Sequence, residues 1–193
     1  MAEVLLFHHV QGLTPGVQAF AEALRRAGHV VHVPDLFDGL VFDELEEGLA
    51  HARATGFDTI IARGRASADE LPEGLVYAGI SMGVLPAQAL AQTRPGAKGA
   101  VLLESCLPPS EFGGAWPDSV PVQVHGMDAD PSFALEGDLD AARELVAAAP
   151  DATLFVYPGD RHLFTDSSLA AHDPQAAALV TERVLSFLAR VDR

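Results

Sequence analysis

LVYAGISMG, residues 75–83, is an apolar run that ends in the pattern Gly-x-Ser-x-Gly. A helical pattern begins directly after it, at Val84. This succession predicts a nucleophile elbow, in which a buried strand, a sharp turn and a helix hold a serine hydroxyl at the edge of a sheet. Gly79 and Gly83 fit such a turn, because side chains there would collide where the strand and the helix pass close together. The alternative is a plain strand-to-helix turn in which Ser81 only caps the helix.

The composition is that of a folded, acidic protein. The chain has 193 residues, 49% of them hydrophobic, which suits one domain (residues 1–193) with a sizeable core. A formal net charge of −15 argues against binding nucleic acid or an anionic membrane through bulk charge. The lone cysteine, Cys106, fits a reducing compartment, and the N-terminal residues lack a signal-peptide pattern. We therefore expect a cytoplasmic monomer or homodimer that binds neither nucleic acid nor membrane.

Short apolar runs alternate with helical patterns along the chain. Six runs have the length of buried strands: residues 4–7, 30–33, 75–80, 100–103, 120–124 and 153–157. Helical patterns cover residues 15–27, 42–54, 82–92 and 139–148 and the segment after Asp173-Pro174. Residues 57–61 fit a helix end or a short strand, and residues 63–74 read as polar loop. The alternation predicts an α/β fold, a three-layer sandwich whose mainly parallel sheet of about six strands has helices on both faces and no cap domain.

Polar side chains collect where the predicted strands end, the edge at which such sheets form their sites. Ser81 follows the third strand, Asp128 and Asp130 follow the fifth, and His162 follows the sixth. The order Ser, Asp, His is that of the α/β-hydrolases. An imidazole can take the proton of a serine hydroxyl near neutral pH, and a carboxylate can orient that imidazole. The pattern therefore predicts Ser81 as nucleophile and His162 as base, and it leaves the two aspartates as alternatives.

Other histidines also lie at strand ends and suggest a second interpretation. His8, His9 and His125 could belong to a metal site. However, no pair of ligands has the i, i+4 spacing of a helical metal site, and Cys106 is alone. We therefore expect no metal and no cofactor. His162 itself could be an ordinary histidine of a surface loop.

The chain resembles the dienelactone hydrolase family of α/β-hydrolases along nearly its whole length. The matching stretches are residues 9–15, 33–37, 79–83 and 157–164. The resemblance implies Ser81 as nucleophile, His162 as base, an aspartate after the fifth strand, and an oxyanion hole made by the backbone N–H groups of Met82 and Val10. We favour Asp130 over Asp128, because the Pro131-Ser132-Phe133 that follows it resembles the turn after the family's catalytic aspartate.

The sequence also departs from the pattern of the well-studied members. Those use cysteine as nucleophile, where this chain has Ser81. They carry a glutamate in the first loop, where this chain has His9, and an arginine four residues past the histidine, where it has Asp166. An aspartate at that position would repel a substrate carboxylate. We therefore carry over the hydrolase chemistry and expect dienelactone-type carboxylates to be poor substrates.

Together these residues favour a serine hydrolase that acts on an ester, lactone or similar acyl bond of a small molecule. We expect His9, Phe112 and Trp116 to contribute to the substrate pocket, the last two as an apolar wall after the fourth strand. A non-catalytic relative that binds a small ligand in the same pocket is the main alternative. A flavodoxin-like phosphate site at residues 79–83 is another, opposed by the missing P-loop lysine and by nearby carboxylates.

Overall fold

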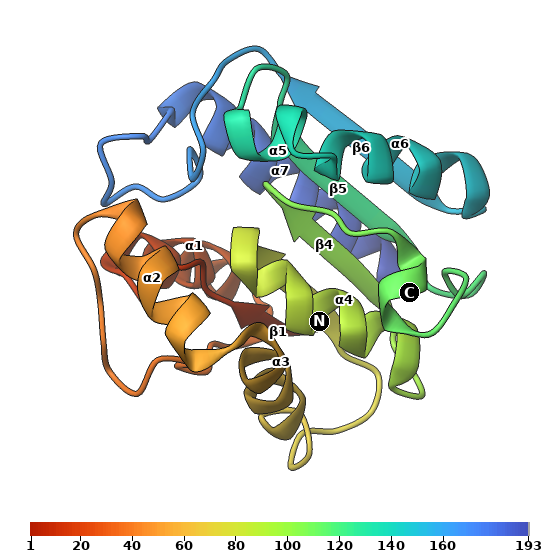
Figure 1. The fold of residues 1–193 in the computed structure, drawn as a ribbon. Coiled ribbons are helices and arrows are strands. Elements are labelled where there is room, and N and C mark those ends of the chain that lie inside the picture. Colours follow the sequence, from red (N-terminus) through yellow and green to blue (C-terminus); the bar gives the residue numbers. More distant parts are fainter. Residues whose placement is uncertain (193) are drawn as a thin grey trace.

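The computed structural model describes residues 1–192 and contains one six-stranded parallel sheet (Figure 1). The strand order is β2-β1-β3-β4-β5-β6. The strands are β1 (Glu3–Phe7), β2 (Val30–His32), β3 (Val76–Ile80), β4 (Gly99–Leu103), β5 (Val122–Met127) and β6 (Ala152–Tyr157). The helices are α1 (Pro15–Arg26), α2 (Leu45–Thr55), α3 (Phe57–Ala66), α4 (Val84–Thr93), α5 (Pro131–Leu135), α6 (Asp138–Ala148) and α7 (Pro174–Val191). The predicted three-layer α/β sandwich is confirmed, and residues 1–192 contain no separate cap domain.

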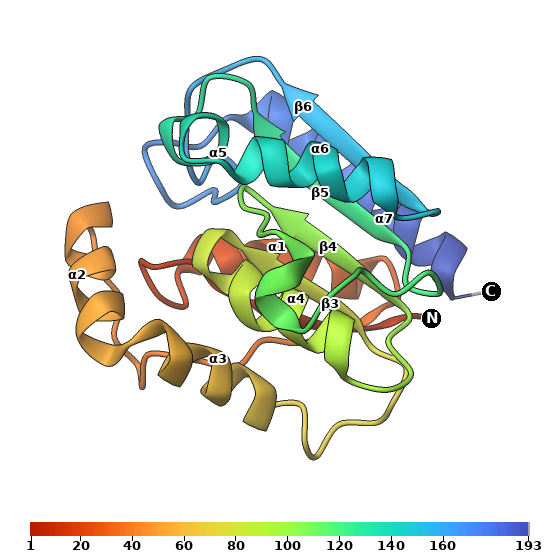
Figure 2. The same cartoon turned by 45° about the vertical axis from the view of Figure 1, so that its right-hand side comes forward.

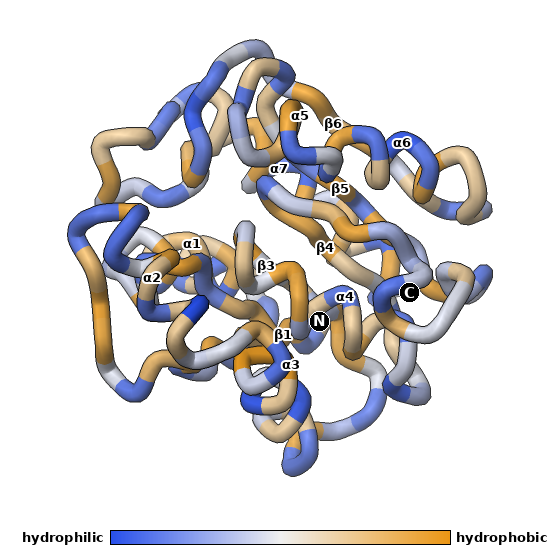
Figure 3. The backbone as a smooth tube through the Cα atoms, in the orientation of Figure 1, coloured by the Kyte–Doolittle hydropathy of each residue, from blue (hydrophilic) through white to orange (hydrophobic). Residues whose placement is uncertain are grey.

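Helices cover both faces of the sheet, as Figures 1 and 2 show from two directions. Helices α1 and α7 pack on one face, where their apolar side chains join those of β1, β3 and β4 in one core. Helices α3, α4 and α6 cover the other face and enclose a second core. Every residue of β3, β4 and β5 is buried, because neither face of these central strands meets water. The hydropathy colouring of Figure 3 shows these strands as apolar runs between polar connections.

The segment that the sequence leaves ambiguous is the helix α3, so the expectation of polar loop from residue 63 is wrong up to Ala66. Gly56, at a φ of 88°, separates α2 from α3. Within α3, Ile60 is buried, and a Cβ on Gly64 would lie 2.3 Å from Cβ of Pro86. Close packing of α3 on α4 therefore holds the helix, and the local pattern of hydrophobic residues is too weak to reveal it.

Other boundaries shift by a few residues. The fifth strand begins at Val122, two residues later than predicted, because Pro121 cannot donate to a strand ladder. The short helix α5 after β5 was not predicted. Within residues 1–192, none of the helices combines the length and the apolar character needed to cross a membrane.

Parallel pairing brings the carboxyl ends of all six strands to one edge of the sheet. Three polar residues follow directly or closely after neighbouring strands at this edge: Ser81 after β3, Glu104 after β4 and Asp130 after β5. His162 lies in the long connection after β6. Residues distant in sequence are thereby gathered beside β3, at the middle of the sheet.

Candidate active site

Ser81 occupies a sharp turn between β3 and α4. Its φ of 49° is in the left-handed region, which costs a non-glycine residue about 1–3 kcal/mol and is most often found at functional sites. A single 3₁₀ turn, Ser81–Gly83, leads into the helix. A Cβ on Gly79 would lie 2.2 Å from the carbonyl oxygen of Gly83, and one on Gly83 would lie 2.3 Å from that of Phe7. Strand and helix therefore approach too closely for side chains there, and the serine is held outward.

A continuous chain of hydrogen bonds runs from Ser81 through His162 to Asp130. Oγ of Ser81 lies 2.8 Å from Nε2 of His162, and Nδ1 of His162 lies 2.8 Å from Oδ2 of Asp130. Asp130 is fully buried and also caps α5, its Oδ1 accepting from the N–H of Ser132 at 2.9 Å. Asp128 is exposed and accepts instead from the N–H of Gly159. The structure thus brings Asp130, and not Asp128, to the imidazole.

The surroundings of His162 favour its protonated form. Burial by itself would lower the pKa of this imidazole. The hydrogen bond to Asp130 and the negative charges of Glu104, Asp130 and Asp138 act in the opposite direction and outweigh burial, so the pKa of His162 is raised above its usual value. The imidazole is therefore a stronger base than an exposed histidine and can hold a proton taken from Ser81.

A pocket of about 240 Å³ opens beside Ser81 and His162. Its apolar wall consists of Val10, Leu45, Leu49, Met82, Leu85 and Leu107. Its polar groups are Ser81, Glu104, Ser105, Ser132, Asp138 and His162. No lysine or arginine is among these lining residues, all of which lie in the described part of the chain. The pocket has room for a small molecule and carries two carboxyl groups without a fixed cation.

A sequence model of the dienelactone hydrolase family matches residues 1–192. The chain belongs to the dienelactone hydrolase family. It is accordingly a hydrolase of the α/β-hydrolase fold. A comparison with the curated proteins gave no match.

Solved structures share the fold of this family member at low sequence identity. A dienelactone hydrolase-like promiscuous phosphotriesterase from metagenomic libraries has a TM-score of 0.76 at 19% identity, over 99% of this chain and 87% of the other. Esterase 2 of Thermogutta terrifontis, phosphonylated by cyclosarin, has a TM-score of 0.72 at 18% identity, over 98% and 83%. A lipase in its open form has a TM-score of 0.69 at 15% identity, over 98% and 90%. At these identities the likeness is one of fold.

Glu104 is a lining residue of the pocket that the sequence analysis missed. It follows β4 with a φ of 63°, and its side chain is buried, with the residue 1% exposed. Its Oε1 accepts from the N–H of Thr165 at 3.0 Å and from the hydroxyl of Thr165 at 2.8 Å. Its Oε2 has no hydrogen-bond partner among residues 1–192. Burial raises the pKa of Glu104, and the nearby charge of His162 and the donors of Thr165 oppose that rise. The signal that could have found it is its place directly after a buried strand.

Asp138, the second missed residue, is the first residue of α6 and also lines the pocket. Its Oδ2 accepts from the hydroxyl of Ser105 at 2.6 Å and from the N–H of Cys106 at 3.1 Å. Burial raises its pKa, and the two donors oppose this rise. Because Ser105 and Cys106 directly follow Glu104, the segment after β4 connects the two carboxyl groups.

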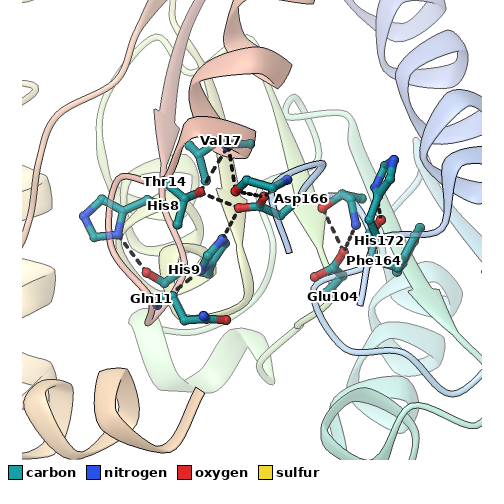
Figure 4. A network of polar contacts seen from close by, with 12 residues as sticks. His8, His9, Gln11, Thr14, Val17, Glu104, Phe164, Asp166 and His172 are labelled. Atoms are coloured by element: carbon teal, nitrogen blue, oxygen red, sulfur yellow. Dashed lines mark hydrogen bonds and ion pairs between the residues drawn. The ribbon is translucent and has the colours of Figure 1, made fainter. Parts of the chain in front are cut away.

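His9 lies outside this pocket, contrary to expectation. The residue is fully buried, and its Nε2 lies 2.8 Å from Oδ2 of Asp166 (Figure 4). The N–H of Gln11 donates to its Nδ1 at 3.2 Å, so the imidazole hydrogen is on Nε2 and points at the carboxylate. Hydroxyls of Thr14 and Ser168 donate to the same carboxylate. His9 therefore anchors the first loop instead of lining the pocket.

Asp166 also differs from its expected role, since it does not face the pocket. Burial by itself would raise its pKa, but hydrogen bonds from His9, Ser168 and Thr14 hold the pKa down to about 2. This carboxylate is a satisfied, buried anion of the first-loop network. The carboxyl groups that a substrate would meet are instead Glu104 and Asp138.

Phe112 and Trp116 do not form the expected apolar wall beside Ser81. Trp116 is buried in the core, and its indole N–H donates to the carbonyl of Val120 at 2.6 Å. Phe112 ends a short 3₁₀ turn and is buried away from the pocket. Leu107, nearer to β4 in the same loop, lines the pocket instead. A position in a loop near the site did not reveal on which side of the loop each aromatic ring packs.

The three histidines weighed as a metal site make separate contacts. Nε2 of His8 accepts from the N–H of Leu36 at 2.9 Å, while Nδ1 of His125 lies 2.9 Å from the hydroxyl of Tyr157. Nε2 of His9 is hydrogen-bonded to Asp166. Within residues 1–192, no group of three or more histidine, cysteine or carboxylate side chains is arranged to hold a metal ion.

Proposed function

We propose that this member of the dienelactone hydrolase family is a serine hydrolase that cleaves an ester, lactone or similar acyl bond of a small molecule. The observation that carries the proposal is the unbroken hydrogen-bonded chain Ser81–His162–Asp130, of which Ser81 and His162 line a small pocket. The strained backbone at Ser81 supports it, since such strain is retained where function requires it.

The proposed reaction follows from the roles of these groups. His162 takes the hydroxyl proton as Oγ of Ser81 attacks the substrate carbonyl, and Asp130 stabilises the imidazolium. The backbone N–H groups of Met82 and Val10 hold the oxyanion, a role supported by the place of both residues in the pocket wall. His162 then gives the proton to the leaving alcohol oxygen, and water hydrolyses the acyl-serine by the same steps. No cofactor takes part.

The size of the pocket limits the substrate. A volume of about 240 Å³ with leucine and valine walls suits a short acyl chain or a small lactone. The lone Cys106 favours a reducing compartment and so supports the proposal that the enzyme works in the cytoplasm. We further propose that it works there as a monomer or homodimer.

Labelling with a fluorophosphonate tests the nucleophile. We expect the wild-type protein to be labelled and the Ser81→Ala variant to remain unlabelled with an unchanged circular dichroism spectrum. Cys106→Ala is the matched control and should label like the wild type, because Cys106 is buried and burial raises the pKa of its thiol to about 12. Labelling that persists in Ser81→Ala would disprove the assignment.

A panel of short-chain esters and lactones then separates the two classes of function. Turnover by the wild type that disappears in Ser81→Ala supports a hydrolase of acyl bonds. Saturable binding of the same compounds without turnover, in a wild-type protein that fluorophosphonate does not label, would support the non-catalytic relative instead.

A further inference from the structure

We propose that Glu104 and Asp138 form a receptor for a positively charged amino group of the substrate, in the same pocket as Ser81. This inference rests on the proposed function for its reaction and names the class of substrate. It starts from the composition of the pocket wall, which presents two carboxyl groups and, among the described residues, no basic side chain except His162.

The unpartnered oxygen of Glu104 is the observation that points to a ligand. A buried oxygen without a donor is costly, and native proteins rarely keep one without a reason. Thr165 holds Oε1 with two hydrogen bonds and so fixes the carboxyl group in place. Oε2 remains without a partner among residues 1–192, on a side chain that lines the pocket.

The neighbouring imidazoles cannot supply the missing donor. Both ring nitrogens of His162 are engaged, one with Ser81 and the other with Asp130. Both nitrogens of His9 are engaged as well, with Asp166 and with the N–H of Gln11. Neither histidine donates to Glu104, and the influence of His162 on the pKa of Glu104 is electrostatic. Among residues 1–192 no group donates to Oε2, and we assign that donor to a molecule in the pocket.

Asp138 offers a second acceptor to the same molecule. Within the described chain, both donors that reach this carboxyl group, from Ser105 and Cys106, bind Oδ2. Oδ1 is thereby left available for a ligand. The hydroxyl of Ser105 fixes the orientation of Asp138, and Thr165 fixes that of Glu104, the residue before Ser105. Both acceptors are therefore in place before a ligand binds.

Charge selects an ammonium group over other donors. A protonated amine carries up to three N–H donors and a charge that offsets those of the two carboxylates. Burial raises the pKa of both acids, and the charge of His162 opposes that rise in each. A bound ammonium group would oppose it further and favour the charged carboxylates. The net charge of −15 adds a long-range attraction for cations. A carboxylate-bearing substrate would meet repulsion at the same place.

Two sets of isosteric probes test this receptor. The first set varies the charge on the leaving group, which in these thioesters is a thiol. The S-acetyl derivatives of dimethylaminoethanethiol, isoamyl thiol and mercaptopropionate differ only in a terminal dimethylammonium, isopropyl or carboxylate group. The second set varies the charge on the acyl side: the para-nitrophenyl esters of β-alanine and butanoate. In at least one set we expect kcat/KM for the cationic probe to exceed that for the neutral one by a factor of about ten or more. A factor of ten corresponds to a difference of about 1.4 kcal/mol in activation free energy.

Variants assign the preference to the two carboxyl groups. In Glu104→Gln and in Asp138→Asn the ratio of cationic to neutral kcat/KM should fall towards one. The two rates in each ratio are measured on the same variant, so an effect of the substitution on the hydrolytic step common to both probes cancels. Either variant suffices for the test if the other does not fold. Glu111→Gln and Asp140→Asn are matched controls that remove the same charge from exposed positions and should keep the wild-type ratio.

Direct binding separates this proposal from the proposed function. Calorimetry with Ser81→Ala compares the cationic and neutral members of both sets, and in at least one set the cationic probe should bind more tightly, whether or not the wild type turns it over. Equal or weaker binding of the cation in both sets, or a wild type that prefers the neutral probe in both sets, would overturn the receptor while leaving the serine hydrolase intact. A control variant that loses the preference as Glu104→Gln does would also overturn it, since the effect would then come from bulk charge.

Discussion

Two hydrogen-bonded histidine–aspartate pairs lie at the same edge of the sheet. The distance from the imidazole nitrogen to the carboxylate oxygen is 2.8 Å both in His162–Asp130 and in His9–Asp166, and both aspartates are buried. They differ in what the second imidazole nitrogen meets. In His162 it faces the hydroxyl of Ser81, and the side chain is 12% exposed. In His9 it accepts a backbone N–H, and the side chain is fully buried.

The difference teaches that a histidine–aspartate pair does not by itself define a site of proton transfer. The His9–Asp166 pair is closed on both sides by protein donors, so it can only hold the first loop in place. The His162–Asp130 pair ends in a reactive hydroxyl beside a pocket. We therefore expect the first pair to affect stability and the second to affect turnover, and substitutions can test this division.

The largest expected effect is that of Asp130→Asn. Loss of the carboxylate removes the group that fixes the imidazole tautomer and stabilises the imidazolium, so kcat should fall by about 10⁴. The fold should survive, because asparagine caps a helix about as well as aspartate and α5 keeps its cap. Ester turnover and circular dichroism check both parts.

Asp128→Asn is the matched control for this comparison, since Asp128 follows the same strand and its exposed carboxylate accepts from the N–H of Gly159. It should retain wild-type turnover. If the two variants behave in reverse, the orienting carboxylate is Asp128 and the structural distinction between the aspartates fails.

Asp166→Asn should show the opposite balance. Removing a buried charge that accepts from His9, Thr14 and Ser168 should lower the free energy of unfolding by about 2–4 kcal/mol. Turnover per folded molecule should stay close to that of the wild type. Urea denaturation at pH 7 measures the first quantity, and a loss of turnover comparable to that of Asp130→Asn would break the division between the two pairs.

The pH dependence of stability gives the same pair a second test. The pKa of Asp166 is about 2 in the folded protein, below the value of about 4 of an unfolded chain. A depressed pKa stabilises the folded state above the unfolded pKa, and that stabilisation is lost as pH falls from about 4 towards 2. The stability difference between wild type and Asp166→Asn should therefore shrink over this range.

The smallest expected effect is a shift of the pH–rate profile in Glu104→Gln. His162 is active as the neutral base, and its raised pKa makes the wild type lose activity as pH falls through that pKa. The negative charge of Glu104 contributes to the rise, so its removal should move the midpoint of kcat/KM for a neutral ester to lower pH. Glu111→Gln should not shift it. An unchanged midpoint in Glu104→Gln would show that the two groups are electrostatically independent.

Much of the fold could be predicted because parallel strands buried on both faces appear as continuous apolar runs. The place of Ser81 and His162 could be predicted for a related reason, since the carboxyl ends of parallel strands meet at one edge. Glu104 has the same signal, a charged residue directly after a buried strand. It was overlooked because it stands alone there and belongs to no recognised motif.

The roles of the remaining residues could not be predicted, because they depend on contacts between segments distant in the sequence. Asp138 starts a helix well after β5, so no local pattern places it in the pocket. Asp166 was misinterpreted because counting residues from His162 ignores Leu163, whose φ of 63° turns the chain and allows the carboxylate to reach His9. Helix α3 depends on packing against Pro86, which lies far along the chain.

The two ends of the described chain lie together at the opposite end of the sheet from the pocket. The amino group of Met1 pairs with the carboxylate of Asp192, and Figure 2 shows the start of the chain near the end of α7. An affinity tag or a surface tether attached at either end would therefore leave the mouth of the pocket unobstructed. A short linker could also join the ends, and a circular permutant opened in an exposed loop would keep the arrangement of Ser81, His162 and Asp130.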